Sequence, residues 1–427
     1  MTDPTPPLTD STSPAADSPA PAAGSASPES VCEKAPTEAA CSGSAGGCGL
    51  SALRRSSGPR PSVTVAEETE IPPTVVPSAP AGPWAPAASS APEWLVAETV
   101  WWGGRLRSGV ALRVAPDGRV RPVPAELAPD GDGTRRFPGT LLPGLVDAHV
   151  HSALVDLGTV RAGGIAEVWD LGGVPEKVAA LAGRSRKPDA GLPRIRYAGP
   201  FLTAPGGYPS DRPWAPAGSW REICSEADAD TAVSAAWSAG ASLIKVTAHA
   251  GGPMPAPATL AALVTSARAA GLPVVMHAEG AGTVAAAHTA GADMLAHTPW
   301  TERIDDELLR ACAQRMTWIS TLDIHGWGDP DPASGIAVDN LRRFLEYGGS
   351  VRYGTDLGNG PLPPGVNIRE IRLLLSAGLT PDGVLTAMTE TDSSTISWIP
   401  GGLDLADLPD SLATARVVGP GVHPRVL

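Results

Sequence analysis

LLPGLVDAHVH, residues 141–151, is the most informative run of this chain. Its apolar residues predict a buried strand, and two histidines one residue apart stand at the end of that strand. Side chains two positions apart on a strand lie on the same face of it. Both imidazoles can therefore reach one cation, although a strand can also carry two such histidines for packing alone.

Further candidate metal ligands stand at or near the ends of later predicted strands. They are Lys245, His277, His297 and Asp356, in the runs 242–246, 272–277, 292–297 and 351–356. Nitrogen and carboxylate ligands suit zinc and similar divalent metals. The recurrence at strand ends predicts a metal site built on a scaffold of strands.

The apolar runs belong to a repeating pattern between about residues 140 and 395. We identify eight of them, at 141–150, 165–171, 194–201, 242–248, 272–278, 292–298, 316–322 and 350–356. Ala- and Leu-rich stretches with helical character separate most of them, such as 227–239, 259–270, 281–290 and 305–314. Strands that alternate with helices favour parallel pairing. The pattern predicts an α/β fold, a (β/α)8 TIM barrel over residues 141–394 whose site lies at the carboxyl ends of the strands.

Several segments together resemble the amidohydrolase superfamily, within it the imidazolonepropionase-like and metal-dependent dipeptidase-like branch. They are LLPGLVDAHVH (141–151), AEVWDLGG (166–173), AGPFLTAPGGY (198–208), IKVTAHAGG (244–252), PVVMHAEG (273–280), AGADMLAHTPWT (290–301) and RYGTDLG (352–358). The resemblance covers about residues 94 to 394, and the order of the motifs makes it specific. Trp169 departs from the branch, which usually has an arginine there, and this departure bears on substrate choice.

The resemblance implies two divalent metal ions, which we expect to be zinc. Their ligands would be His149 and His151 of the first strand, His277 and His297 of the fifth and sixth, a carboxylated Lys245 that bridges the ions, and Asp356. Two such ions can lower the pKa of a water to about 7 and polarise a carbonyl. We expect a hydrolase of an amide or cyclic amide C–N bond, in which metal-activated hydroxide attacks the carbonyl and Asp356 acts as general base and acid.

Other polar residues follow the same strands and are candidates for contact with the substrate. We expect Tyr208, His249 and His325 to face a small molecule such as a dipeptide or a cyclic amide, and Glu279 to support a ligand. Simpler interpretations stay open at single positions. Lys245 could be an inward-facing lysine paired with a carboxylate, and Asp356 could cap a following helix.

Composition sets the remaining expectations. Residues 1–92 are rich in Pro, Ser and Ala and poor in aliphatic residues, so we expect them to be disordered. Short strands and turns over 93–140 predict the first part of a small β domain, to which 395–427 would return as a short, divergent segment. The formal charge of −13 disfavours nucleic-acid binding. No apolar run of membrane-spanning length and no signal peptide are visible, so we expect a cytoplasmic protein; no sequence feature indicates an oligomeric state.

Two other functions remain open from the sequence. A deaminase of the same superfamily commonly uses one metal and no bridging lysine, so Lys245 argues against it. A non-catalytic relative could keep the barrel as a binding module, and the divergent carboxyl end and the long amino-terminal stretch are the features that favour this.

Overall fold

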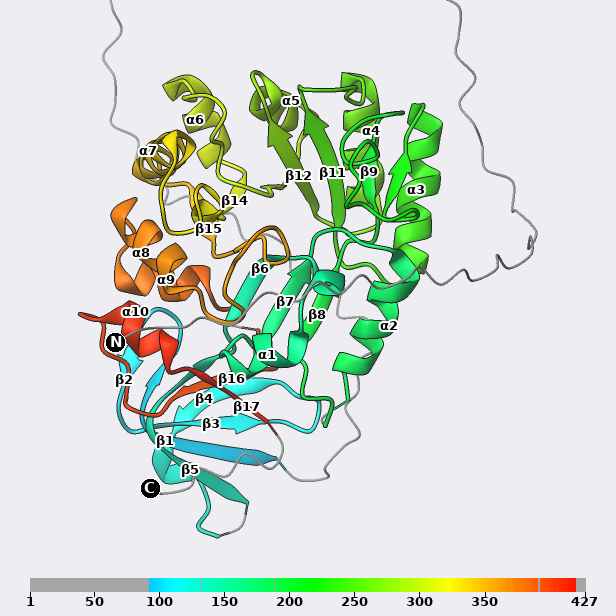
Figure 1. Ribbon diagram of the computed structural model, residues 1–427. Helices are drawn as coiled ribbons and strands as arrows, with labels where there is room; N and C mark the ends of the chain where they lie inside the picture. The colour runs from blue at the N-terminus through cyan, green and yellow to red at the C-terminus, as the bar shows by residue number, and fades with distance from the viewer. Residues whose placement is uncertain (1–91, 132, 188, 391, 420–427) are drawn as a thin grey trace, which may run out of the picture. The chain divides into compact units, whose positions relative to one another are not determined.

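The computed structural model describes residues 92–131, 133–187, 189–390 and 392–419. All of them belong to Val63–Leu427, the larger of the two units into which the chain divides (Figure 1). The stretch 1–92 that we expect to be disordered lies outside the described residues, apart from Pro92. Within the described ranges, no helix combines the length and the apolar character that a membrane span requires.

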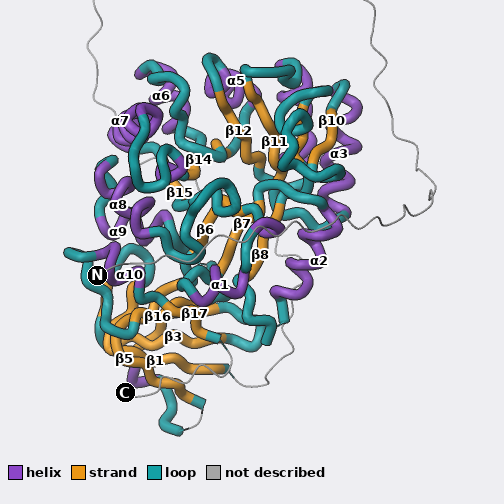
Figure 2. The backbone as a smooth tube through the Cα atoms, viewed as in Figure 1, coloured by secondary structure: helices purple, strands orange, loops and turns teal. Residues whose placement is uncertain are grey.

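Strands from both ends of the described chain form one seven-stranded sheet (Figure 2). It consists of β1 (Glu93–Trp101), β2 (Leu106–Arg107), β3 (Val110–Val114), β4 (Val120–Pro124), β5 (Thr134–Pro143), β16 (Ile396–Ile399) and β17 (Arg416–Val418). The order is β17-β16-β5-β1-β3-β4, with β2 paired to β1. A 3-10 turn, η1 (Ala125–Leu127), follows β4, and β1 runs parallel to β5 while the other pairs are antiparallel. The segment after residue 395 therefore joins the sheet that precedes the first histidine strand.

The other strands form two parallel sheets. One has the order β6-β7-β8, and the other has the order β10-β9-β11-β12-β13-β14-β15. Their bounds are β6 (Val146–Val150), β7 (Glu167–Asp170), β8 (Arg194–Tyr197), β9 (Phe201–Thr203), β10 (Trp220–Glu222), β11 (Ile244–His249), β12 (Val274–Glu279), β13 (Met294–Leu295), β14 (Thr317–Ile319) and β15 (Ser350–Arg352). The fold is thus mixed α/β with parallel sheets.

Backbone hydrogen bonds connect both edges of the three-stranded sheet to the seven-stranded one. Ser242 N, just before β11, donates to the oxygen of Tyr197 in β8 over 2.9 Å. Ala148 N of β6 donates to the oxygen of Tyr353 over 3.0 Å, and Val150 forms a parallel bridge with Leu357. The first histidine strand therefore lies next to the segment that follows β15.

Helices alternate with the parallel strands, and local sequence signals set several of their ends. Their bounds are α1 (Leu157–Ala162), α2 (Pro175–Ser185), α3 (Glu226–Ser238), α4 (Pro257–Ala269), α5 (Thr283–Ala290), α6 (Asp306–Ala313), α7 (Pro332–Glu346), α8 (Ile368–Ser376), α9 (Pro381–Ala387) and α10 (Leu408–Ala413). The side chains of Ser225, Asp305 and Asp331 cap α3, α6 and α7 by accepting a backbone N–H. In Figure 1, α3, α4 and α5 lie alongside β11 and β12, and α4 and α5 contact β12.

The apolar side chains of this region separate into two buried clusters. One cluster packs the helices against the strands and includes Val246, Met276 and Leu295. The other takes its side chains from the strands and their ends: Val146, Ala148, Trp169, Leu171, Ala198, Leu243, Val275, Met294, Ala296 and Ile319. Alternate residues of the same strands thus enter different clusters, as the period of two along a strand requires.

Several of the expected strands are shorter than the sequence pattern predicts. The run 194–201 is divided between β8 and β9, and the runs 292–298, 316–322 and 350–356 keep only β13, β14 and β15. Beyond β15 the backbone finds other partners, since Tyr353 N donates to Ala387 O and Leu357 N donates to His149 O. Apolar character alone does not show where a strand stops pairing with its neighbour, because the residues that follow the strand are buried as well.

Candidate metal centre

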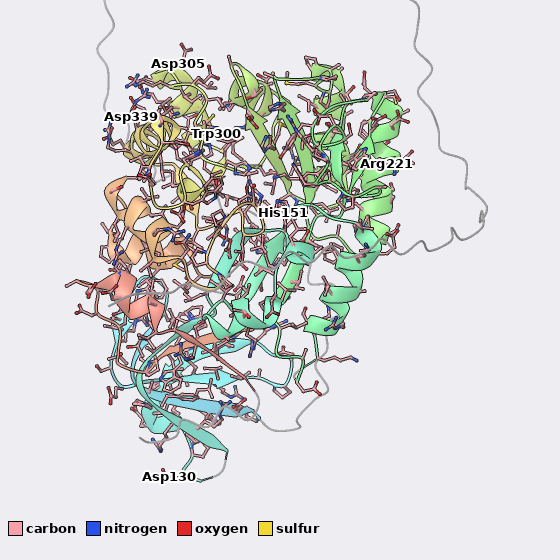
Figure 3. The ribbon with its side chains drawn as sticks, in the orientation of Figure 1. Asp130, His151, Arg221, Trp300, Asp305 and Asp339 are labelled. Atoms are coloured by element: carbon pink, nitrogen blue, oxygen red, sulfur yellow. The ribbon has the colours of Figure 1, made fainter. Side chains whose placement is uncertain are left out.

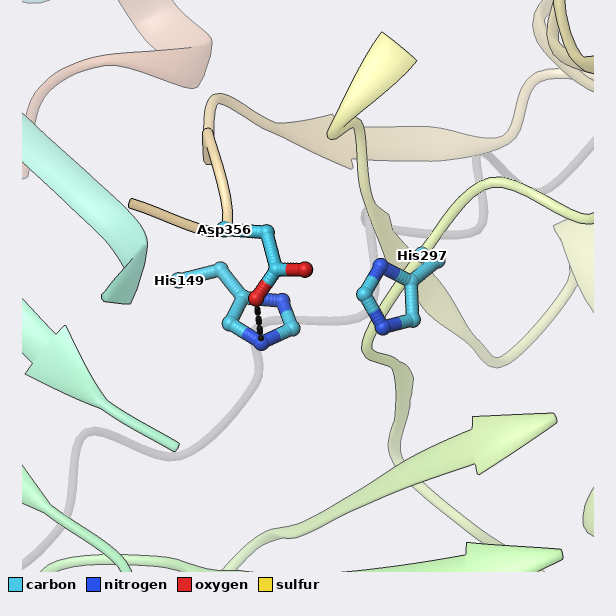
Figure 4. A group of neighbouring side chains, drawn as sticks. All are labelled: His149, His297 and Asp356. Carbon is cyan, nitrogen blue, oxygen red and sulfur yellow. Dashed lines mark ion pairs between the residues drawn. The ribbon is translucent and has the colours of Figure 1, made fainter. Parts of the chain in front are cut away.

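Four of the predicted metal ligands meet in a buried junction, of which Figure 4 shows His149, His297 and Asp356. Oδ1 of Asp356 lies 3.0 Å from Nε2 of His149 and 3.1 Å from Nε2 of His151. In Figure 4 the Asp356 carboxylate points at His149, and the ring of His297 faces the same space. Ligand atoms of His149, His297 and Asp356 all lie within 4.8 Å of one another. Residues that are more than 200 positions apart along the chain are therefore neighbours here.

Asp356 reaches this junction through an unusual backbone conformation. Its φ is 59°, in the left-handed region that Asp tolerates better than most side chains. Asn359 anchors the residue, because its backbone N donates to Asp356 O over 3.0 Å and its Nδ2 donates to Oδ2 over 2.8 Å. The next helix, α8, begins at Ile368 and is capped by Asn367. The alternative that Asp356 caps a following helix is therefore wrong.

His151 also lies just outside regular strand, directly after β6. It is the N-cap residue of the short 3-10 turn η2 (Ser152–Leu154). Ser152 N donates to Oδ2 of Asp170 over 2.8 Å, which holds the turn against β7. The ring centroids of His149 and His151 are 5.4 Å apart, and both Nε2 atoms face the same carboxylate oxygen. The expectation that the two rings share a face fits this arrangement.

The imidazoles of the junction are oriented by hydrogen bonds at Nδ1. The Nδ1 of His149 lies 2.8 Å from Ala296 O, and that of His151 lies 3.1 Å from Gly172 O. A carbonyl oxygen only accepts, so we assign Nδ1–H as the donor in both rings. The Nδ1 of His297 lies 2.9 Å from Oγ1 of Thr321, which can accept in the same way. Each Nε2 then carries a lone pair that faces the junction.

Burial and mutual charge set the protonation of the junction. Burial lowers the pKa of His149 to about 4 and that of His297 well below its usual value, so both rings are neutral at pH 7. Burial alone would raise the pKa of Asp356, but His149, His151 and His297 outweigh it and hold that pKa well below its ordinary range. Burial lowers the pKa of His151, but the negative charge of the nearby Asp356 raises it, and the net shift is an increase. The neutral rings of His149 and His297 beside an ionised carboxylate are donors of the kind that a divalent cation requires.

Lys245 and His277 lie in the same buried cluster, on the neighbouring strands β11 and β12. Lys245 is 1% exposed. Burial lowers its pKa to about 7, and the negative charge of Asp356 opposes that shift. The charge of Lys245 also acts to lower the pKa of His277, which burial lowers most. The rings of His277 and His297 are perpendicular, with centroids 5.0 Å apart. A chain of ring contacts thus runs from His151 through His149 and His297 to His277, and Lys245 lies close enough for its charge to interact with that of Asp356.

The three predicted substrate residues are distributed unequally around this cluster. Tyr208 stacks on His277, with centroids 4.9 Å apart and planes at 21°, and its centroid lies 5.3 Å from that of His249. His325 makes no ring contact with His277 or His249. Its neighbour is Trp300, with 5.2 Å between the two ring centroids. Burial raises the pKa of Tyr208 above its usual value, so its phenol keeps the proton and can donate a hydrogen bond.

Two residues that sequence reasoning did not select support the site. Oδ2 of Asp147 accepts a hydrogen bond from Oγ1 of Thr355 over 2.6 Å, which fixes the segment before Asp356 to β6. Trp300 lies 5.4 Å from His297 and 6.1 Å from His277 between ring centroids, and Figure 3 labels it with His151 among the strand ends. The period of two along a strand already puts Asp147 on the face of His149 and His151. That signal could have identified Asp147.

Glu370 secures the start of the loop that carries His325. Its side chain is fully buried, and Oε2 accepts a hydrogen bond from Asp323 N over 2.7 Å at η3 (Leu322–Ile324). Asp323 is held further by Arg369 and by Nδ2 of Asn367, at 2.8 and 2.7 Å. Burial raises the pKa of Glu370 to about 7, so the fold favours its protonated form at moderately acidic pH.

This shift predicts a pH dependence of stability that Glu370→Gln removes. In the unfolded chain the carboxyl group has its ordinary pKa, so the stabilisation is complete below about 4.5 and is lost as the pH rises to about 7. The loss should be roughly 3 kcal/mol of unfolding free energy. Urea unfolding of both proteins between pH 4.5 and 7.5 measures it. If the unfolding free energies of the wild type and Glu370→Gln change in parallel over this pH range, the prediction is wrong.

The arrangement of donors fits a metal. Oδ1 of Asp356 is buried and has no hydrogen-bond partner among the described residues, although two Nε2 atoms lie close to it. Buried oxygens are rarely left without a partner. Nitrogen lone pairs that converge on a buried carboxylate oxygen are satisfied by a cation among them. His149, His151, His297 and Asp356 would hold such an ion, with Lys245 and His277 beside them.

No protein-family model matches the chain, and no curated protein matches it in sequence. Its fold is similar to solved structures of a Xaa-Pro dipeptidase (17% identity, TM-score 0.63), of A. niger ochratoxinase (17%, 0.63) and of molinate hydrolase (16%, 0.61). Each similarity covers 77% of this chain, and 98%, 94% and 93% of the respective other chain. These neighbours are members of the amidohydrolase superfamily. At such identities the similarity shows a shared fold.

Proposed function

We propose that the protein is a metal-dependent hydrolase of a C–N bond, in an amide or a cyclic amide, and a member of the amidohydrolase superfamily. The junction of Asp356 with His149 and His151 carries this proposal, because a buried carboxylate oxygen without a hydrogen-bond partner faces two imidazole nitrogens there. The fold shared with a dipeptidase and two other hydrolases supports it. The ligand set is His149, His151, Lys245, His277, His297 and Asp356, for two divalent ions that we propose to be zinc.

The scaffold of this site is a closed (β/α)8 barrel made by eight strands of the two parallel sheets, β6 to β8 and β11 to β15. The backbone bonds at both edges of the three-stranded sheet support closure, because they link β8 to the residue that precedes β11 by two positions, and β6 to the segment after β15. The separation of the apolar side chains supports it too, since one cluster would fill the barrel and the other would lie under the helices. We assign residues 93–140 and 395–427 to the small β domain and 141–394 to the barrel.

The two cations would lower the pKa of a water to about 7 and polarise the carbonyl of the substrate. The protein's own residues then handle the protons. Asp356 is ionised, and its Oδ1 faces the junction, so it can take a proton from the attacking water and pass it to the leaving nitrogen. Oδ2 is held by Asn359, which keeps the carboxylate in this orientation.

Lys245 suits the role of a bridge only after modification. An ammonium repels cations, and a free amine offers one lone pair. Burial lowers the pKa of Lys245 to about 7, which makes the neutral amine available at physiological pH. That amine can attack the carbon of CO2; an N–C bond forms, one proton leaves, and an anionic carbamate with two oxygens remains. A carboxylated Lys245 would hold both ions.

The substrate is a small molecule, such as a dipeptide or a cyclic amide, and Tyr208, His249 and His325 are the candidates to contact it. Tyr208 and His249 lie against His277, which favours a direct role for these two. His325 would act from the far side of Trp300. A cytoplasmic location and the absence of nucleic-acid partners stay predictions from the sequence.

Metal analysis combined with a substrate screen tests the proposed function. The full chain should contain two inner metal ions and should cleave at least one member of a panel of dipeptides, hydantoins and imidazolones. His149→Asn should lose metal and activity together, whereas His288→Gln, in α5, should keep both. One metal with release of ammonia would identify a deaminase instead. A chain with neither metal nor turnover would be a binding module.

A further inference from the structure

A second group of potential ligands lies beside the inner site and shares His277 with it. Its members are His249, His277 and Glu279, whose ligand atoms all lie within 4.8 Å of one another. Oε2 of Glu279 is 3.1 Å from Nδ1 of His249 and 3.0 Å from Nε2 of His277. His277 would serve the inner site through Nδ1, because its Nε2 faces Glu279. Two nitrogens and one carboxylate oxygen therefore converge on one point.

The backbone sets this convergence. In the parallel pair of β11 and β12, His249 lies directly opposite Glu279, and Thr247 lies opposite His277. His277 and Glu279 are two residues apart, so their side chains share one face of β12. The three side chains thus occupy one face of a two-stranded ribbon at its carboxyl end, and the grouping follows from strand register.

The spacing of the three ligand atoms is close to what a tetrahedral cation needs. With metal–ligand distances of about 2.0–2.1 Å, neighbouring ligand atoms of a tetrahedral site are about 3.3 Å apart. The two distances from Glu279 Oε2, 3.1 and 3.0 Å, need to increase by only a few tenths of an ångström. Nδ1 of His249 is buried and makes no well-aligned hydrogen bond within the described residues. A cation between the three atoms would satisfy it.

The surroundings fit an ion that binds and leaves from solvent. The side chains of His249 and Glu279 are 15% and 30% exposed, so water can complete the coordination shell. Tyr208 lies over the rings of both His249 and His277 and limits their rotation. Gly251 packs close to His249, because a Cβ at this position would lie 2.5 Å from Nε2. The ring of His249 is therefore held with Nδ1 turned towards Glu279.

We propose that His249, His277 and Glu279 form an outer binding site for one additional divalent cation of the zinc type, next to the inner site. Two imidazole donors select zinc, cobalt, nickel or copper over magnesium and calcium, which prefer oxygen ligands. The cation replaces the proton on Nε2 of His277, and that proton is released to solvent. The outer site has three protein ligands and one position open to water, so it binds more weakly than the inner one.

Cation stoichiometry tests the outer site without any measurement of activity. The full chain, without a purification tag, is stripped with a chelator and dialysed against free Co2+, and bound cobalt is measured by mass spectrometry. His249→Gln should bind one equivalent less than the wild-type chain, because His249 belongs only to the outer site. His288→Gln controls for the loss of a histidine elsewhere and should bind as much as wild type. If circular dichroism shows that His249→Gln does not fold, His249→Asn is used in its place.

The outcomes separate this inference from the proposed function. Three equivalents in wild type and two in His249→Gln support both the outer site and the binuclear inner site. Equal binding by wild type and His249→Gln overturns the outer site, whatever the total. One equivalent in wild type and none in His249→Gln supports the outer site and contradicts the binuclear hydrolase.

Discussion

Asp356→Asn is expected to lower kcat for C–N cleavage by about 10²- to 10⁴-fold, the range that a positioned general acid or base contributes. Asn keeps the shape of the side chain and can still accept at one oxygen, but it cannot take a proton. The pKa of Asp356 lies well below its ordinary range, so the wild-type carboxylate is available as a base across the neutral range. Steady-state kinetics on the best substrate of the panel, with metal content measured on the same samples, gives the result.

The control for this prediction is another aspartate of the same region that is not part of the junction. Asp211 lies in the loop after β9 with its side chain 50% exposed, and Asp211→Asn should leave kcat unchanged. Metal content separates two roles of Asp356. A variant that keeps its metal and loses turnover has lost the base, whereas loss of both indicates a ligand role. Wild-type turnover in Asp356→Asn would mean that the proton travels by another route.

The parts of the site that could be read from the sequence are those in which local periodicity decides the geometry. His149 lies in β6, Lys245 in β11 and His277 in β12; β6 lies within its predicted run, and β11 and β12 each end one residue beyond theirs. Alternation along each strand then sets which side chains face inward. A strand pattern carries this information because its period of two is the same wherever the strand is placed.

Geometry that depends on contacts between distant parts of the chain could not be predicted from local periodicity. The left-handed turn at Asp356 relies on Asn359, and the link from Asp147 to Thr355 joins residues 208 positions apart. The pairing of His249 with Glu279 needs the register of β11 on β12, which single-strand patterns do not contain. Such features depend on tertiary contacts. Tertiary contacts also explain why some strands are shorter than the sequence pattern predicts.

Trp169 illustrates how a departure from a family pattern becomes intelligible only in three dimensions. Its side chain is buried, and the guanidinium groups of Arg196 and Arg352 lie 5.4 and 4.8 Å from the ring centroid. An arginine at this position would add a third positive charge beside these two. The tryptophan instead offers its ring faces to both cations. The sequence position alone does not indicate that two arginines converge there.

Lys245→Ala is expected to reduce turnover by more than 100-fold and to lower the metal content of the inner site. Replacement of residues that only orient metal ligands already costs 10- to 100-fold in affinity or activity, and a bridging ligand contributes directly to both ions. Lys177→Ala, an exposed lysine in α2, is the matched control and should behave as wild type. Equal metal content and turnover in Lys245→Ala and wild type would exclude a bridging role.

Carboxylation of Lys245 can be separated from a plain structural role of the lysine. Metal-free protein reloaded in buffer depleted of CO2 should take up less than two inner ions, and added bicarbonate should restore uptake in wild type but not in Lys245→Ala. With ¹³C-bicarbonate, wild type should give one carbamate carbon signal by NMR, and Lys245→Ala should give none. A small carboxylic acid such as acetate fits the space that Ala leaves and supplies the same two oxygens, so it should restore part of the metal binding. Full reloading without CO2, together with no carbamate signal, would mean that Lys245 stays an amine and that the two ions share a different bridge.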